Sequence, residues 1–171
     1  MIIIINGSLG VGKSTTAEEL HWKFSKSVCL DGDYIGNVNP FEIYDDERID
    51  HLYRTLELLV KFHQENGYEK FVINYVFESA DSLQNLLDLL RPLDLSIHVY
   101  WLTCDKEKQA KRIMDRKRDD VDWELKRFVE LQDIQRQAAQ RGFIGNEIDT
   151  TDLTVGEAAD RIWNDIFSTD R

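Results

Sequence analysis

The segment Gly7–Ser14 has the residue types and spacing of a phosphate-binding loop. Its sequence, GSLGVGKS, follows the apolar run Ile2–Ile5 and precedes the helix-like stretch Thr15–Leu20. A polyphosphate must be met by several backbone N–H groups at once, so such a loop needs glycines that turn tightly and carry no side chain into the ligand. The segment therefore predicts a site for a nucleoside triphosphate.

Each residue of this loop has an expected task. A helix that begins at Lys13 adds unpaired amides and the positive end of its dipole. We expect Lys13 to contact the outer phosphates and the Ser14 hydroxyl to ligate a magnesium ion. The expected nucleotide-binding residues are Gly7, Ser8, Gly10, Val11, Gly12, Lys13, Ser14 and Thr15.

Two carboxylates close the segment Val28–Asp33, whose sequence is VCLDGD. Side chains alternate along a strand, so Asp31 and Asp33 are expected on one side of it, near the phosphate loop. We expect Asp31 to hold magnesium with Ser14, and Asp33 to accept a hydrogen bond from a substrate hydroxyl and orient it for in-line attack. The alternative is an acidic turn that merely ends the strand.

The next strand ends in Asn74-Tyr75-Val76-Phe77-Glu78. Glu78 and Asn74 are expected to line the substrate pocket, with Tyr75 and Phe77 as its apolar wall. The loop between residues 34 and 46 is expected to supply the rest. The alternative is that the aromatic residues belong to the core and Glu78 is solvated.

A basic segment interrupts an otherwise acidic chain. Its Lys108, Arg112 and Arg116 share one helical face, while Ala110, Ile113 and Met114 are expected to turn inward. We expect a lid near residues 112–122, in which Arg116 and Arg118 close over the transferred phosphate and Arg112 contacts the nucleotide base or its phosphates. The alternative is a solvated face. The basic residues are Lys106, Lys108, Lys111, Arg112, Arg116, Lys117 and Arg118.

Strands and helices are expected to alternate along the chain. Apolar residues recur at helical spacing over residues 49–60 and 83–90, and Thr154 with Glu157 forms a capping box before the last helix. Apolar strands separated by helices predict an α/β fold with a parallel sheet covered on both faces, and ligands bind beyond the carboxyl ends of such strands. The expected strands are Ile2–Asn6, Val28–Asp31, Phe71–Val76, Ser96–Leu102 and one around Glu147–Asp149.

Composition limits the possible partners. The 171 residues predict a single domain, 1–171, and a net charge of −11 disfavours nucleic acid. Neither a signal peptide nor a membrane span is expected, which predicts a cytoplasmic protein, monomeric or homodimeric. Cys29 and Cys104 are expected to be buried free thiols. None of His21, His51, His63 and His98 has metal-ligand spacing, and Trp22, Trp101, Trp123 and Trp163 are expected to anchor the core.

These motifs together resemble the small P-loop kinases, the group of shikimate, gluconate and adenylylsulfate kinases and chloramphenicol phosphotransferase, within the AAA-type P-loop ATP-binding proteins. The matching segments are Gly7–Ser14, Leu30–Asp33, Arg112–Arg118 and Ile148–Thr151. The resemblance implies a three-layer fold with a five-stranded sheet in order 2-3-1-4-5, and ATP with its adenine near the base of the lid. Adenylate kinase's Asp-Gly-Phe/Tyr-Pro-Arg segment, the acceptor arginines of shikimate kinase and an Asn-Lys-x-Asp guanine motif are missing.

The expected function is an ATP- and magnesium-dependent transfer of the γ-phosphate to a hydroxyl of a small molecule. In this expectation Lys13, Asp33, Arg116 and Arg118 are catalytic, Asp33 and Glu78 contact the acceptor, and Ser14 and Asp31 hold the metal. Two alternatives stay open. One is a tunicamycin-resistance-like ATP-binding protein without strong turnover, and the other is a kinase of polynucleotide 5′-hydroxyls.

Overall fold

Five parallel strands form one sheet in the order β2-β3-β1-β4-β5. The computed structural model describes residues 1–93, 95–116 and 120–168. This sheet, with helices on both faces, confirms the expected fold class and strand order. The strands are β1 (Ile2–Gly7), β2 (Val28–Asp31), β3 (Phe71–Asn74), β4 (Ile97–Thr103) and β5 (Asn146–Asp149).

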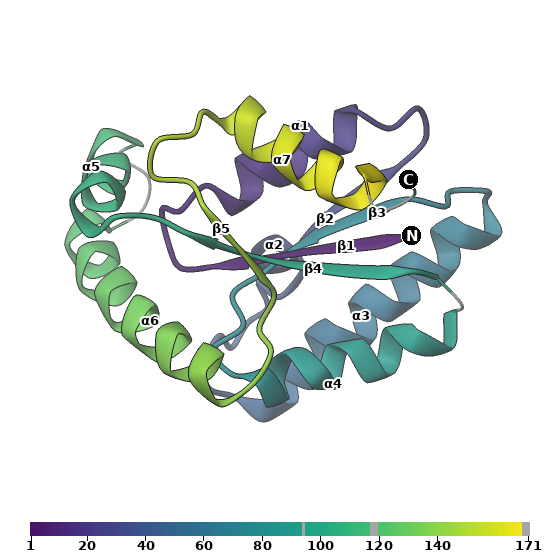
Figure 1. The fold of residues 1–171 in the computed structure, drawn as a ribbon. Coiled ribbons are helices and arrows are strands. Elements are labelled where there is room, and N and C mark those ends of the chain that lie inside the picture. The colour runs from purple at the N-terminus through teal and green to yellow at the C-terminus, as the bar shows by residue number, and fades with distance from the viewer. Residues whose placement is uncertain (94, 117–119, 169–171) are drawn as a thin grey trace.

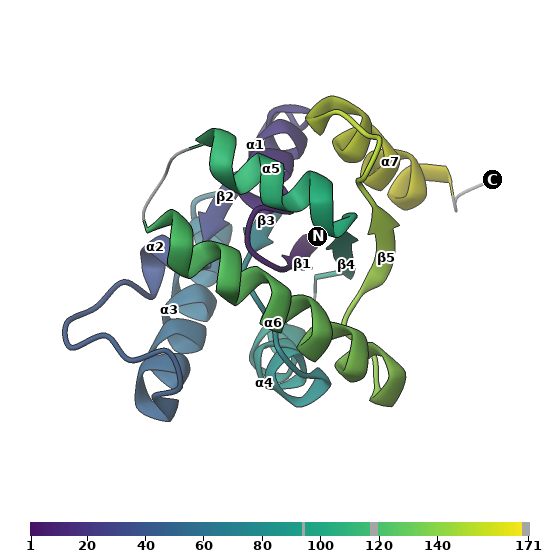
Figure 2. The same ribbon diagram turned by 90° about the vertical axis from the view of Figure 1, so that its left-hand side faces the viewer.

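Helices cover the two faces of the sheet and its carboxyl edge. Figure 1 shows α1 (Lys13–Trp22) and α7 (Val155–Ser168) on one face, and α3 (Asp46–Glu65) and α4 (Ala80–Leu90) on the other. Two further helices, α5 (Lys106–Arg116) and α6 (Val121–Arg141), lie across the ends of the strands (Figure 2). The short α2 (Gly32–Ile35) follows β2, and a 3-10 turn, Arg91–Leu93, follows α4.

The central strand β1 is fully buried and shows how the sequence divides the core. Ile2 and Ile4 pack with the apolar residues of α3 and α4, whereas Ile3 and Ile5 pack with those of α1 and α7. Successive side chains of a strand point to opposite faces, so four consecutive isoleucines supply both layers. Because β1 is the middle strand of the sheet, its end and the loop after it lie at the middle of the carboxyl edge.

The capping box predicted for the last helix is present. The Thr154 N–H donates to Glu157 Oε2 at 2.8 Å, and the Glu157 N–H donates to Thr154 Oγ1 at 3.2 Å. These reciprocal bonds satisfy amides that the first turn of α7 would leave without partners. The apolar stripe of α7, including Ile162 and Ile166, is buried against β1 and α1.

Several details differ from the sequence-based expectations. The third strand ends at Asn74 rather than Val76. Met114 was expected to turn inward but is 47% exposed, whereas Ile113 is fully buried. Trp22 and Trp123, expected in the core, are 73% and 47% exposed; Trp101 is buried as expected. Cys104 is a buried free thiol, and Cys29 is only partly buried.

No helix in the described residues is both long and apolar enough to cross a bilayer.

Candidate functional site

The phosphate loop lies at the carboxyl end of β1 and leads directly into α1. Gly10 and Gly12 adopt φ values of 74° and 102°, a left-handed conformation that other residues rarely take. A Cβ atom on Gly10 would lie 2.4 Å from Ile113 Cγ1 of α5, so this position also needs glycine for space. Local backbone geometry and packing against α5 therefore both require the glycine spacing seen in the sequence.

Lys13 is the first residue of α1 and its side chain crosses the mouth of the loop. Its Nζ atom donates to the Ser8 carbonyl oxygen at 2.9 Å, and the residue is only 6% exposed. Burial lowers the pKa of Lys13, while the nearby carboxylates of Asp33 and Asp31 act in the opposite direction. The cavity thus holds the Lys13 ammonium group near two carboxylates.

Asp31 and Ser14 are brought together by Asn74 at the end of β3. The Asn74 Nδ2 atom donates to Asp31 Oδ2 at 2.9 Å and to Ser14 Oγ at 3.2 Å. Since both oxygens bond to one nitrogen, they lie close together. Hydroxyl and carboxylate oxygens are hard ligands of the kind that Mg²⁺ prefers, and Mg²⁺ keeps several waters rather than needing a full protein cage. The pair therefore fits the expected metal position.

The relation between the two aspartates differs from the sequence-based expectation. Strand β2 ends at Asp31, and Asp33 lies in the first turn of α2 rather than further along a strand. The Asp31 carboxylate caps this helix, accepting the Asp33 N–H through Oδ1 at 2.9 Å. Asp31 is therefore held by both Asn74 and the helix start, and both aspartates line the same cavity.

A buried amide network beneath the loop was not predicted. Gln109 of α5 is fully buried, and its Nε2 donates to Ser8 Oγ at 2.5 Å and to the Leu9 carbonyl. Gln132 of α6 donates to Gln109 Oε1 at 2.5 Å and to the Cys104 carbonyl at 3.0 Å. In the sequence, a glutamine within a helix rich in charged residues looks like a surface residue, so the burial of these two could not be predicted. They instead attach α5 and α6 to the phosphate loop.

Asn6, the residue before Gly7, is the centre of a second buried network. Its Oδ1 accepts the Gly7 N–H at 2.7 Å, the Phe77 N–H at 2.9 Å and Gln135 Nε2 at 2.9 Å. Its Nδ2 donates to the Ile144 carbonyl at 3.1 Å. These bonds fix the start of the loop relative to the segment after β3, the segment before β5 and α6.

A cavity of about 1130 Å³ joins the loop to the residues expected to contact an acceptor. One half contains Lys13, Ser14, Asp31 and Asp33. The other half is mainly apolar and aromatic, and it includes residues from the segment between α2 and α3, which was expected to form the substrate pocket. Its apolar and aromatic residues are Phe41, Ile43, Tyr44, Ile49, Tyr53, Tyr75, Val76, Trp123 and Leu131.

Two arginines of this second half were not predicted. Arg48 of α3 is 6% exposed and donates to the carbonyls of Glu42, Ile43 and Gly36 at 2.8, 2.9 and 3.4 Å, which fixes the loop before α3. Its guanidinium also lies 4.7 Å from the Phe41 ring centre. The second arginine is Arg127 of α6, described with Glu78 below. Single basic residues within amphipathic helices carry no spacing signal that identifies them in a sequence.

Glu78 lies at the cavity wall, but its carboxylate already has two partners. Oε1 accepts Arg127 Nη2 at 2.5 Å, and Oε2 accepts the Tyr44 hydroxyl at 3.3 Å. Phe77, expected beside it as part of the wall, is instead fully buried in the core, because its side chain points under the sheet toward α3 and α4. Tyr75 does line the cavity.

The arginines expected in the lid already have partners in the protein. Arg116 lines the cavity and forms an ion pair with the buried Glu124 of α6. Arg112 lines neither cavity; it donates to the Thr150 carbonyl at 2.8 Å and to Thr150 Oγ1 at 3.2 Å. Arg118 lies outside the described residues. The contacts of these arginines with a nucleotide stay a prediction.

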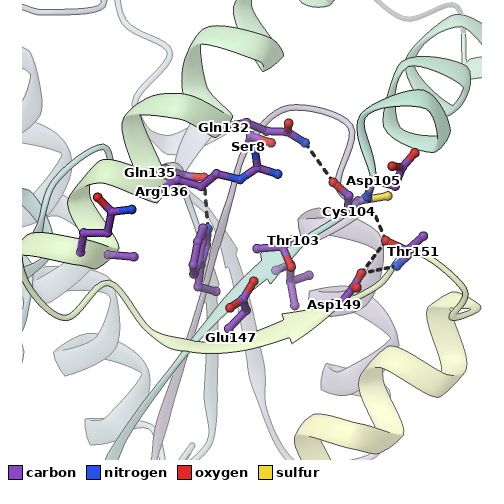
Figure 3. A pocket seen from close by; sticks show the side chains of 14 residues that line it. Ser8, Thr103, Cys104, Asp105, Gln132, Gln135, Arg136, Glu147, Asp149 and Thr151 are labelled. Atoms are coloured by element: carbon purple, nitrogen blue, oxygen red, sulfur yellow. Dashed lines mark hydrogen bonds between the residues drawn. The ribbon is translucent and has the colours of Figure 1, made fainter.

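A second cavity, of about 610 Å³, lies between α6, β4 and β5 (Figure 3). Glu147 and Asp149 of β5 face it, together with Asp105 from the turn after β4 and Arg136 from α6. Figure 3 also shows the Gln132 bond to the Cys104 carbonyl and the bonds from Thr151 to Asp149. Of the phosphate loop only Ser8 lines this cavity, whereas several loop residues line the larger one, where the triphosphate is expected.

This combination of a parallel sheet, a phosphate loop after its central strand and two helices across the carboxyl edge defines a P-loop protein with a small-kinase fold. A family model described as an AAA domain matches residues 3–135, and the chain belongs to that family. No curated protein matches the chain.

Solved structures share the fold at low sequence identity. The tunicamycin resistance protein of Deinococcus radiodurans is 20% identical with a TM-score of 0.69, covering 97% of this chain and 95% of that one. A shikimate kinase of Bacteroides thetaiotaomicron is 11% identical with a TM-score of 0.66 over 98% of both chains. The APS kinase of Mycobacterium tuberculosis, solved with AMPPNP and APS, is 15% identical with a TM-score of 0.63 over 95% of both. At these identities the similarity establishes the fold.

Proposed function

We propose that the protein is a kinase that transfers the γ-phosphate of ATP to a hydroxyl of a small molecule. The observation that carries the proposal is the larger cavity, in which phosphate-loop residues and two aspartates open directly into an aromatic half. A triphosphate on the loop and an alcohol in the aromatic half would then meet beside Asp33. The cytoplasm, where ATP is abundant, is the proposed location.

The proposed reaction assigns a task to each group. The loop amides and Lys13 bind the phosphates and stabilise the charge that spreads over the transferred group. Asp33 accepts a hydrogen bond from the acceptor hydroxyl and takes its proton as the new O–P bond forms and the bond between the γ-phosphorus and the bridging oxygen of ADP breaks. Arg116, which lines the cavity and keeps its ion pair with Glu124, would add positive charge near the same phosphate.

Ser14 and Asp31 are the residues proposed to hold Mg²⁺, Asp31 directly or through water. Their oxygens are already grouped by Asn74, which supports the assignment. When bound, the ion would neutralise part of the charge on the β- and γ-phosphates. Asn74 would keep the Asp31 carboxylate oriented toward the metal position, as outer hydrogen bonds do at metal sites.

The proposal is tested by a screen of alcohols for ATP consumption, with detection of a phosphorylated product by mass. We expect one or more alcohols to gain the mass of a phosphoryl group in a reaction that requires Mg²⁺. Lys13→Ala should weaken both nucleotide binding and turnover. Glu19→Gln, on the exposed side of α1 and outside the cavity lining, is the matched control and should behave as the unmodified protein.

Binding without turnover, as in the tunicamycin-resistance-like alternative, predicts a different outcome of the same screen. ATP would bind in a manner that depends on Lys13, but no alcohol would be phosphorylated. The tunicamycin resistance protein of Deinococcus radiodurans supports this alternative only through the shared fold.

A further inference from the structure

The aromatic half of the larger cavity contains information about the acceptor that the phosphate loop does not. Five aromatic side chains line it: Phe41, Tyr44, Tyr53, Tyr75 and Trp123. Tyr53 belongs to α3 and Trp123 to α6. Phe41 and Tyr44 lie in the segment before α3, and Tyr75 follows β3. A wall of this kind favours the flat or apolar body of a ligand over the many hydroxyls of a sugar.

The positive charges that line this half are already bound to the protein. Arg127 pairs with Glu78 and with Glu130, and its guanidinium lies 5.5 Å from the Tyr44 ring centre. Arg116 pairs with Glu124. An acceptor carboxylate or phosphate is usually held by a guanidinium that offers two parallel N–H bonds. No arginine among the described lining residues presents that fork without a protein partner.

Arg48 is the third guanidinium, and it too is used within the protein. Its three bonds to backbone carbonyls and its stacking on Phe41 fix the loop that forms one wall. Turning this guanidinium toward an anionic acceptor would leave three carbonyl oxygens without their donor, which is costly for each one that stays buried.

One carboxylate oxygen of a cavity-lining residue has no hydrogen-bond partner among the residues that the structure describes. Glu124 is 3% exposed, and its Oε1 pairs with Arg116 while its Oε2 is buried without a hydrogen bond. A buried, unpartnered carboxylate oxygen is costly unless a ligand donor meets it. The group that would satisfy Oε2 is a hydroxyl or an ammonium, and a second carboxylate there would be repelled.

We propose that the acceptor is an uncharged or cationic alcohol with an aromatic or similarly apolar body, which donates a hydrogen bond to Glu124. This rests on the proposed kinase function and deepens it. The proposal excludes a sugar acid or a phosphate ester as the acceptor. The wall of the cavity is apolar, and the guanidinium groups that line it are already bonded to other groups of the protein.

Three benzyl alcohols with a neutral, a cationic and an anionic para substituent test the proposal: 4-methylbenzyl alcohol, 4-(aminomethyl)benzyl alcohol and 4-(hydroxymethyl)benzoate. Binding is followed by tryptophan fluorescence and calorimetry with AMPPNP and Mg²⁺ present, and product by mass with ATP. We expect the neutral and cationic alcohols to bind at least about tenfold more tightly than the benzoate, since like charges facing each other across an interface are costly. D-gluconate should bind no better than the benzoate.

Glu124→Gln should reduce the preference for the amine over the methyl compound severalfold, because it removes the charge while keeping the side-chain shape. Asp133→Asn, an exposed change on the same helix outside both cavities, should leave the preference unchanged. Equal or tighter binding of the benzoate, absence of binding for all three alcohols, or an unchanged preference in Glu124→Gln would overturn the proposed acceptor class.

The two proposals fail separately in this experiment. The expected binding order without any phosphorylated product supports the ligand class and removes the kinase function. Preferential phosphorylation of the benzoate or of gluconate supports the kinase function and removes the ligand class.

Discussion

Asn74 connects the two groups that are proposed to hold magnesium. Replacing it with alanine would leave Asp31 held only through the start of α2 and Ser14 without this donor. We expect Asn74→Ala to weaken Mg²⁺-dependent AMPPNP binding about tenfold or more, the usual effect of losing an outer hydrogen bond at a metal site. Calorimetry with excess EDTA is the control, because the two proteins should then bind nucleotide equally.

Cys29 offers a test of the environment beside Asp31. Burial, with the nearby Asp31 carboxylate, raises the pKa of Cys29 to about 11. Only the thiolate reacts, so at pH 8 alkylation by iodoacetamide should be about 100-fold slower than for a thiol with a pKa of 9. Peptide mass spectrometry resolves Cys29 from Cys104, and the rate in urea gives the unperturbed value. Equal rates in the folded and unfolded protein would contradict the described burial.

At the scale of elements, the capped start of α4 fixes the chain next to the cavity residue Glu78. Ser79 caps α4 directly after Glu78, its Oγ accepting the Ser82 N–H at 3.0 Å. Ser79→Ala should lower the free energy of unfolding by about 1 kcal/mol, the typical effect of removing a cap. Ser79→Asp keeps an acceptor at the cap and should restore most of that loss in urea denaturation. Equal stability of the two variants would exclude a capping role.

The elements themselves were largely predictable, and the acceptor half was not. Continuous isoleucines, helical spacing and the capping box of Thr154 with Glu157 are local signals, and each produced the expected strand or helix. Helix α6 contributes Glu124, Arg127 and the amides under the loop, yet these contacts join residues far apart in the sequence. Asp33 was expected on a strand and lies on α2, because the side chain of Asp31 starts a helix there.

At the scale of the whole molecule, the net charge of −11 favours a small-molecule acceptor over a polynucleotide. Phosphate contacts by a polynucleotide kinase would give binding that weakens steeply with salt, and an acidic surface opposes such contacts. We expect no detectable binding of a fluorescent single-stranded oligonucleotide in about 50 mM salt. Anisotropy that rises with protein and falls with added salt would instead favour the polynucleotide alternative.

The position of the loop within the molecule follows from the order of the strands. Because β1 is central, the loop after it lies between the carboxyl ends of its neighbours β3 and β4, with α5 and α6 across them (Figure 2). The sequence predicted this order only through the resemblance to small P-loop kinases. The glycine spacing defines where the phosphates would bind, and the surrounding elements define what lies beyond them.

The claim that phosphate is transferred depends most directly on Asp33. In Asp33→Ala, AMPPNP should bind with nearly unchanged affinity by calorimetry, while the phosphorylated product of any alcohol that the unmodified protein accepts should fall by two orders of magnitude or more, since a positioned base contributes about 10²–10⁴-fold. Retained product formation in this variant would contradict the role of Asp33 in the transfer.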